Sequence, residues 1–455
     1  MNIFNLLSNN FIDFAVEGVG SVGLNWIGKI IRGLFETFDG IYGGAILGVV
    51  IFTLILKTIV LPLDAYSRVK TKKQALIMEG MRPQMEKLKK QYANDNQLYS
   101  QKVMELQKAN GYSPLSACLP MIVSLVIFII VIGAFSTYSN YAIINTYNGM
   151  VDAYNKSVET YVCEIYKIDE NGERVLDKTL NADGFLTYDF YLDENDHHVI
   201  AQGYVADYAK FQKAFEDEAK KNENDKSFED IQKLIEKYNE GGTNAEVYMD
   251  KAVVSFVQLN ARREAARHYR ENTGTNEFGW IGNVWYPDSM LNKVVPEYSK
   301  FKSSISRADN NGAMDYQESY NEVTYYLRNV DPANPDVKLE GNTYNGYFVL
   351  IVLAIGLMFL QQFITTRSQK ATNELSSVDG SAAKTNKWMM ILMPVMYGIF
   401  SFFYSASFST YMIINTCYGL ITTLIINKIV AVYFDKHGFK PPKRKVAANN
   451  RKRLK

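Results

Sequence analysis

A single lysine interrupts an apolar run that is long enough to cross a membrane. Lys57 is the only charged residue within positions 41–63. A lysine near the centre of a spanning helix costs roughly 2.5–3.5 kcal/mol on insertion scales, so such residues usually face a bundle interior or a watery cavity. Lys57 is also six residues from the end of the run, about 9 Å along a helix, so its ammonium group can alternatively snorkel to the headgroups. The position by itself leaves both interpretations open.

Polar residues elsewhere in the apolar runs favour the first interpretation. They recur at helical spacing on single faces of three runs: Thr53, Lys57 and Asp64; Tyr397, Ser401, Tyr404 and Ser405; and Tyr411, Asn415, Tyr418 and Thr422. Gln361 and Gln362 lie towards the end of another run, and Ser124 interrupts a fifth. Isolated Ser, Thr and Asn side chains often only bridge neighbouring helices. Three stripes together with a lysine instead predict a shared polar cavity.

Five apolar runs must position these residues. Each is long enough to cross a hydrocarbon core of about 30 Å: 41–63, 119–139, 344–366, 388–405 and 409–433. The pattern predicts an all-α polytopic membrane protein.

Charge asymmetry predicts the orientation of these spans. Residues 67–112 hold ten Lys or Arg against four Asp or Glu, the loop 367–387 four against two, and the tail from 428 ten against one. Residues 138–344 hold 22 basic and 36 acidic side chains. Short basic segments remain in the cytoplasm, whereas long domains cross regardless of charge. We therefore expect the N-terminus and the segment 140–343 outside, and the tail 434–455 in the cytoplasm.

The cytoplasmic segment 64–112 has the pattern of a helical hairpin. Met81, Met85, Leu88 and Tyr92 share one helical face, with Pro83 among them. A turn is expected at 94–96, followed by a helix that carries Leu98, Val103 and Leu106 and ends at Gly111. The alternative is a merely solvated charged hairpin, but the apolar stripe favours packing.

The exterior segments predict two further features. Residues 1–40 include an amphipathic pattern at 22–38, which indicates a helix lying in the membrane interface or, alternatively, a buried edge helix. Residues 150–275 predict a small α+β domain. Its expected strands are 160–168, 173–179, 185–192 and 198–205, and its expected helices are 206–221, 227–239 and 245–271.

Motifs for covalent chemistry are missing from the sequence. There is no phosphate-binding loop, nucleophile elbow or zinc-protease motif, and the four histidines have no ligand spacing. The acidic stretch 193–196 lacks the spacing and glycine of a calcium loop. We therefore expect a protein that is not an enzyme and needs no cofactor or metal.

Five short motifs occur in the order and spacing of a known family. They are TLILKTIVLPL (53–63), GMRPQMEKLKKQY (80–92), SPLSACLP (113–120), MFLQQ (358–362) and LMP (392–394). Together they resemble the YidC/Oxa/Alb membrane protein insertases over about residues 1–140 and 277–455. The stretch FGWIGNVWYPDS (278–289) is similar to the segment before the third core span of Gram-positive members, here with an enlarged extracellular loop.

This resemblance implies a five-helix bundle with a hydrophilic groove that is open to lipid and cytoplasm and closed outside. The family's single groove cation falls on Lys57, where it would attract acidic residues of a nascent membrane protein. Residues expected to line the groove are Thr53, Ser124, Gln361, Gln362, Ser401, Tyr404, Tyr411 and Asn415. The cytoplasmic hairpin, with Met81, Pro83, Met85, Leu88 and Tyr92, is implied in substrate capture.

Some positions depart from the family pattern. Lys57 replaces the usual arginine, which keeps the charge but loses the bidentate fork for carboxylates. Ser124 and Val126 stand where Gln and Pro are common, Met412 where Trp is usual, and Ser405 in place of a Pro. These changes concern details of the groove rather than the fold.

Partners and rival functions follow from the remaining features. The tail from Lys436 has nine basic residues in twenty, which suits anionic lipid or ribosomal RNA. The insertase resemblance implies the ribosome, the Sec translocon and the phospholipid bilayer as partners, but not DNA.

A small-solute transporter would explain the polar stripes but predicts repeated halves, which the sequence lacks. A membrane-anchored receptor or scaffold would explain 150–275 but leaves the hairpin without a role.

Overall fold

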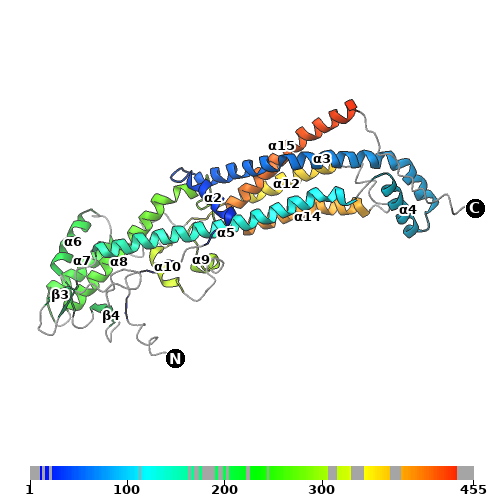
Figure 1. Ribbon diagram of the computed structural model, residues 1–455. Coiled ribbons are helices and arrows are strands. Elements are labelled where there is room, and N and C mark those ends of the chain that lie inside the picture. The colour runs from blue at the N-terminus through cyan, green and yellow to red at the C-terminus, as the bar shows by residue number, and fades with distance from the viewer. Residues whose placement is uncertain are drawn as a thin grey trace, which may run out of the picture. The chain divides into compact units, whose positions relative to one another are not determined.

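The computed structural model describes most of the chain (Figure 1). The described residues are 11–12, 16–19, 23–111, 114–161, 165–168, 174–176, 190–192, 198–200, 204–206, 208–221, 226–242, 245–305, 315–328, 343–368 and 381–437. They are mostly helical and divide into two compact units. We call Asn25–Tyr138, Asn276–Met290 and Asn345–Lys455 the membrane unit, and Met1–Leu24, Ser139–Thr275 and Leu291–Tyr344 the polar unit.

The membrane unit is built from helices, most of them long and apolar. They are α2 (Trp26–Glu36), α3 (Gly44–Gln91), α4 (Asn96–Ala109), the first part of α5 (Pro114–Tyr161), α12 (Val349–Ser368), α14 (Ser381–Phe403) and α15 (Ala406–His437). Helix α15 packs against α3 and α12, and α12 packs against α14. The ring of Phe135 in α5 contacts Phe52 of α3 and both Phe408 and Tyr411 of α15. Four long helices and α14 are thereby joined through side-chain and backbone contacts.

Four helices among the described residues are long and apolar enough to cross a bilayer. Their candidate spans are Gly44–Gln91, Val126–Val158, Val349–Arg367 and Ala406–Lys436, and α14 contributes a shorter apolar stretch, Ile391–Phe403. Large apolar side chains cover their outer surfaces, as Ile59 and Val352 do with 71% and 68% exposure. Such a surface suits lipid rather than water, because contiguous apolar patches of this kind are rare on soluble monomers.

The predicted fourth span ends earlier than expected. The pattern placed Tyr404 and Ser405 on a continuing helix, but α14 ends at Phe403 and α15 begins at Ala406. The Ser405 hydroxyl lies 2.8 Å from the Ser407 hydroxyl and accepts a hydrogen bond from the Phe408 N–H at 3.4 Å. Ser405 therefore caps the start of α15 and cannot continue α14.

Helix α3 runs without interruption from the apolar region into the hairpin. Its 48 residues extend about 72 Å, and it contains Pro62 and Pro83 without ending at either. It packs against α4, which starts at an Asp95 cap whose carboxylate accepts from the N–H groups of Gln97 and Leu98. Gly111, just past the end of α4, has φ of 73°, the left-handed conformation that glycine adopts without strain.

The polar unit combines helices with two small sheets. Its helices are the end of α5, α6 (Tyr208–Lys221), α7 (Lys226–Asn239), α8 (Ala245–Asn272), α9 (Tyr298–Ile305), α10 (Gln317–Val323) and α11 (Tyr325–Arg328). The strands are β1 (Phe11–Ile12), β2 (Ile165–Ile168), β3 (Arg174–Leu176), β4 (Phe190–Leu192), β5 (His198–Ile200) and β6 (Tyr204–Ala206). They form antiparallel sheets in the orders β1-β4-β5 and β3-β2-β6. The pairing of β1 with β4 joins two segments far apart in the chain.

Amide side chains tie an extended segment to this unit. Asn155 accepts from the Val16 N–H at 2.9 Å and donates to its carbonyl at 3.0 Å. Asn148 does the same to Val19, at 2.9 and 2.8 Å. Two asparagines, two turns apart on α5, thus substitute for a neighbouring strand.

Candidate functional site

Lys57 lies on a face of α3 that changes from buried to half-buried within one turn. Thr53 is completely buried, and its hydroxyl donates to the Val49 carbonyl at 2.7 Å. Lys57, one turn further on, is half-buried. Asp64 and Arg68 follow on the same face, close enough for their charges to act on Lys57. Among the described residues, Lys57 has no hydrogen-bonded or ion-paired partner, and the carboxylate whose charge acts on it is Asp64.

Of the two glutamines of α12, Gln361 lies against α15. Gln361 and Gln362 are both half-buried. A Cβ atom added to Gly419 of α15 would lie 3.0 Å from the Gln361 amide nitrogen. The glycine therefore permits a close approach that brings a polar side chain of one apolar helix to the backbone of another.

The polar stripes of α14 and α15 differ in depth. Ser401 is completely buried and donates to the Met412 sulfur at 3.8 Å. Tyr411 is also buried, with its ring 5.5 Å from Phe135 and 5.8 Å from Phe408. Tyr404 and Asn415 are half-buried.

The structure therefore separates the predicted groove residues into two groups. Thr53 and Ser401 present no surface, and their hydroxyls are used within the helix packing. Gln361, Gln362, Tyr404 and Asn415 keep part of their surface, as Lys57 does. The Ser124 side chain lies outside the described residues. Helical spacing predicts which residues share a face of a helix, but it does not predict how deeply each side chain is buried.

The hairpin stripe is a packed core. Met81 and Met85 are buried, and Leu88 and Tyr92 pack against them, whereas Pro83 is exposed. The prediction missed Ile77, Met78 and Tyr99, which belong to the same cluster. Extending the stripe by one turn towards the N-terminus would have found the first two. Burial raises the pKa of the Tyr99 phenol, which therefore stays neutral.

The segment 276–290 closes one end of the membrane unit, a role that the sequence did not reveal. Trp285 is buried, and its ring lies 5.7 Å from Phe35 of α2 and 5.1 Å from Tyr138 of α5. Its indole N–H donates to the Asn276 side chain at 2.7 Å. The carbonyls of Val284 and Tyr286 each accept at 2.9 Å from the first N–H groups of α15, those of Ser407 and Ala406. This segment thus fills the space between helix ends and caps one of them.

A buried carboxylate and a buried amide complete this closure. Asp288 is fully buried and accepts from the N–H groups of Tyr347 and Leu350, at 2.8 and 2.6 Å, beside the start of α12. Asn345 accepts from the Asn283 N–H at 2.8 Å and donates to the Asn283 carbonyl at 2.9 Å. These hydrogen bonds join the segment to the start of α12, as the carbonyls of Val284 and Tyr286 join it to α15.

Helix α2 is anchored to this closed end. Ile31 and Phe35 are buried, while Trp26 and Ile30 are exposed. A Cβ atom at Gly48 of α3 would lie 2.1 Å from the Phe35 ring, so α3 provides a recess for this ring. One face of the helix therefore packs on the protein, and the apolar side chains of its other face are exposed.

These features define a multi-pass helical membrane protein with a half-buried, unpaired cation and one closed end. The chain belongs to the 60Kd inner membrane protein family, whose model matches residues 37–163 and 274–433. The match confirms the family resemblance predicted from the motifs, and it leaves out residues 164–273.

Individual relatives share shorter stretches. The membrane protein insertase YidC of Fusobacterium nucleatum is 34% identical over 109 residues, 24% of this chain and 51% of the relative. Proteins of the same name from Leptospira interrogans and Geobacter sulfurreducens are each 32% identical, over 120 and 114 residues. These matches cover 26% and 24% of this chain, but 18% and 20% of the relatives. The chain thus spans about half of the first relative and about a fifth of the other two. No solved structure matches the chain.

Proposed function

We propose that the protein is a membrane protein insertase that moves nascent membrane proteins into the bilayer and helps them to fold. The observation that carries this proposal is the position of the family match. Its two parts contain Lys57, the cytoplasmic hairpin and the polar residues of α12 and α15. The relatives that share this region are named as insertases.

In the proposed mechanism, Lys57 supplies a positive charge partway across the membrane. Polar exterior segments of a client are costly in hydrocarbon because their charges and backbone groups have no partners there. A hydrophilic groove beside Lys57 lowers this barrier, with Gln361, Gln362, Tyr404 and Asn415 offering hydrogen bonds. The apolar span of the client leaves sideways into lipid, so no covalent step, nucleotide or metal is needed.

We infer that α3, α5, α12, α14 and α15 form the family's five-helix bundle. The packing of α15 on α3 and α12, and the aromatic contacts of α5, support this arrangement. The bundle is closed outside by the segment 276–290 and open towards the cytoplasm. The N-terminus is then outside and the basic tail inside, where it can meet anionic lipid, the ribosome or the Sec translocon.

Residues 150–275 are proposed to be an exterior α+β insertion. The family match skips residues 164–273, which supports an addition to a common core. Removal of 164–273 takes away Arg262, which forms a bidentate ion pair with Glu322 at 2.7 and 2.8 Å. A deletion combined with Glu322→Gln avoids a stranded carboxylate. We expect it to retain insertion of simple clients; complete loss would show that the insertion belongs to the core.

Conditional depletion of the protein, with rescue by variants, tests the function. The readout is insertion of a small membrane protein with an acidic exterior tail. Lys57→Ala combined with removal of the hairpin is expected to abolish rescue, whereas Lys57→Arg retains it. Thr58→Ala is the matched control, because the Thr58 hydroxyl is exposed and bonded only to the Leu54 carbonyl of its own helix. Full rescue by the Lys57→Ala hairpin deletion would rule out the groove mechanism.

A further inference from the structure

Three long helices start at the closed end of the membrane unit and lead away from it. The Tyr42 hydroxyl, just before α3, accepts from the Gly279 N–H at 3.1 Å. Helices α12 and α15 start where Asp288 and the carbonyls of Val284 and Tyr286 accept N–H groups of their first turns. The ends of the apolar stretches of α3, α12 and α15 therefore lie away from the closed end, on what we call the far side of the unit.

The two sides carry opposite charge balances. At the closed end, residues 25–43 and 276–290 hold two basic and four acidic side chains. On the far side, the described stretches 64–73, 363–368 and 425–437 hold seven basic and two acidic side chains. The far side is therefore the positive side of the membrane unit.

Most of this excess lies on α3, directly after its apolar run. Positions 65–78 contain four cations, Arg68, Lys70, Lys72 and Lys73, and no carboxylate. The preceding Asp64 acts on Arg68 through its charge, and no acidic residue lies within one helical turn of any of the three lysines. With Asp64 included, positions 64–78 still have a net charge of +3.

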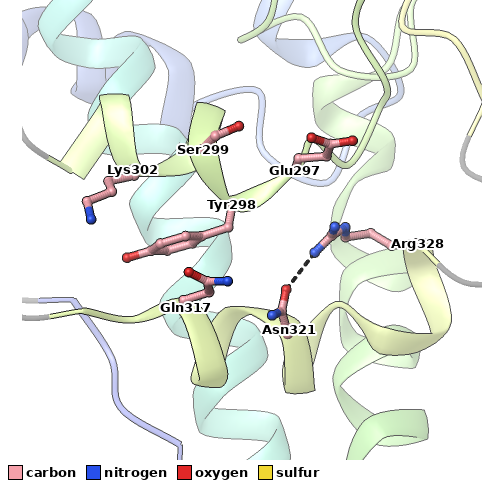
Figure 2. A pocket seen from close by; sticks show the side chains of 7 residues that line it. All are labelled: Glu297, Tyr298, Ser299, Lys302, Gln317, Asn321 and Arg328. Carbon is pink, nitrogen blue, oxygen red and sulfur yellow. Dashed lines mark hydrogen bonds between the residues drawn. The ribbon is translucent and has the colours of Figure 1, made fainter.

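A pocket of about 460 Å³ in the polar unit, by comparison, has balanced charges (Figure 2). Lys302 and Arg328 line it, but so does Glu297. Asp315, in addition, lies against Tyr298 of the same lining. Two cations and two carboxylates offset each other there, so this pocket has no comparable positive excess.

Two of the lysines on α3 continue an exposed apolar stripe. Ile59, Leu63, Tyr66, Lys70 and Lys73 follow one another at helical spacing on one face, which we call the α3 stripe. Ile59, Leu63 and Tyr66 are exposed to 71%, 46% and 57%. The Lys70 ammonium lies over the Tyr66 ring, 4.9 Å from its centroid. One face of the helix thus passes from apolar through aromatic to cationic.

The cationic part of the α3 stripe begins where the hydrocarbon of a bilayer would end. Leu63 is the last residue of the apolar run 41–63, and Tyr66 and Lys70 follow about 4.5 and 10 Å further along the axis. The headgroup layer adds about 5–7 Å on each side of the hydrocarbon core. Helical side chains lean towards the N-terminus, which is the apolar side of α3, so Lys70 reaches back to this layer.

Helix α12 repeats the pattern on the far side. Phe363 is 52% exposed, and the Arg367 guanidinium lies over its ring, 5.8 Å from the centroid. An apolar helix, an exposed aromatic ring and a cation one turn later thus occur on two helices that leave the closed end. Aromatic rings of this kind lie at the level of lipid headgroups, and cations beside them reach the interface.

We propose that Tyr66, Lys70 and Lys73 bind the headgroup phosphate of an anionic phospholipid. The two lysines are one turn apart, with Cβ atoms about 5–6 Å from each other, so both ammonium groups can contact one phosphate. The acyl chains lie along the apolar part of the α3 stripe, which a nucleic acid would leave uncovered. The bound lipid fixes the depth of α3 in the bilayer, and with it the depth of Lys57. Lipid binding itself does not depend on the proposed insertase function.

Photo-crosslinking of the full-length protein in nanodiscs tests the site. The nanodiscs consist of phosphatidylcholine with a small fraction of photoactivatable phosphatidylglycerol or, as the neutral reference, photoactivatable phosphatidylcholine. The readout is the ratio of the two crosslinking yields at residues 59–73. Lys70→Gln with Lys73→Gln is expected to lower this ratio at least about tenfold, because each lysine near the surface contributes roughly fivefold. Lys70→Arg with Lys73→Arg should retain it.

The matched control is Lys87→Gln with Lys90→Gln. These lysines lie on the same helix at the same spacing, and they are exposed in the half of α3 that packs against α4. The control removes the same charge away from the α3 stripe and should leave the ratio unchanged. A thermal melt of each variant checks that the fold is retained.

Four results would overturn the proposal. An unchanged ratio in Lys70→Gln with Lys73→Gln would show that the stripe does not bind the headgroup. An equal fall in the control would attribute the preference to net charge alone. Loss of the preference in inorganic phosphate, but not in chloride of equal ionic strength, would identify a site for free phosphate. Loss of the preference on addition of a short single-stranded RNA would identify a nucleic-acid site.

Discussion

The two halves of helix α3 follow opposite rules of burial. In the first half, Ile55 and Ile59 are exposed while Thr53 is completely buried. In the second half, Met78 and Met81 are buried, while Glu79 and Lys87 are exposed. One continuous helix is thus apolar outside at one end and apolar inside at the other.

This difference indicates that the first half of the helix has a surface suited to lipid and the second half a surface suited to water. Exposed apolar side chains cost nothing in lipid, so the first half can be apolar outside while its inner face buries Ala45, Ile46 and Val49 together with the hydroxyl of Thr53. The second half meets water, and its stability comes from burying methionines and Tyr99 against α4. Lys57 lies within the first half, between the exposed Ile55 and Ile59, and is itself half-buried.

The largest expected effect is on the stability of the hairpin core and comes from truncation of Met78. Met78→Ala leaves a cavity in the hairpin core, and such changes cost about 2–5 kcal/mol. The free energy of local opening of α4, measured by hydrogen exchange, should fall by this amount. Lys87→Ala on the same helix is the control and should change little, because Lys87 is exposed. Unchanged α4 protection in Met78→Ala would mean that the hairpin core contributes no stability.

A charge placed on the apolar outer face of the first half should have a nearly equal effect, in this case on the free energy of membrane insertion. Ile55→Lys adds a charge to an exposed position near the middle of the apolar run, and insertion should become roughly 2.5–3.5 kcal/mol less favourable. The fraction of α3 that inserts in a reporter membrane protein measures this change. In the other half, Lys87→Ile should leave hairpin stability within about 0.5 kcal/mol. Similar insertion of the Ile55→Lys and wild-type spans would show that this face does not meet lipid.

A smaller change tests the connection between the hairpin helices. Asp95→Ala removes the acceptor for two N–H groups of α4, and loss of such a cap costs about 1 kcal/mol. Hydrogen exchange in the first turn of α4 should report it. Asp95→Asn keeps a capping oxygen and is expected to retain most of the protection; equal loss in both variants would exclude capping as the cause.

The smallest effect concerns pH. The Glu105 carboxylate accepts a hydrogen bond from Lys102 at 2.9 Å, and this bond and the charge of Glu105 raise the pKa of Lys102 above 10.5. The stabilisation that the Lys102–Glu105 pair gives to the folded state is therefore complete below pH 10.5. It is lost as the pH rises through the pKa of Lys102 in the folded state. The effect is small because both groups are exposed. Helix content followed above pH 10.5 should fall less in Lys102→Met than in wild type, and an identical titration would refute the contribution of this pair.

Helices that have a hydrophobic period could be predicted from the sequence, whereas contacts between residues far apart in the chain could not. Spans and the hairpin stripe follow from hydrophobic period, so α3, α5, α12 and α15 were found, along with the apolar part of α14. The closure by Trp285 and Asp288 was missed because their partners are distant in the sequence: Phe35 and Tyr138 for Trp285, and Tyr347 and Leu350 for Asp288. For the candidate site, spacing placed Thr53 and Lys57 on one face, but burial depends on which helix covers that face. Spacing alone also did not show that Ser405 would cap α15 rather than continue α14.

The closure by residues 276–290 has a consequence for the order of biosynthesis. Two of its carbonyls are bonded to Ala406 and Ser407, at the start of the last helix. Translation produces the segment more than a hundred residues before these partners. The closed end therefore cannot be completed until α15 has been made, and every earlier intermediate lacks this part of the seal. Synthesis of α15 is thus the step that supplies the partners of these two carbonyls.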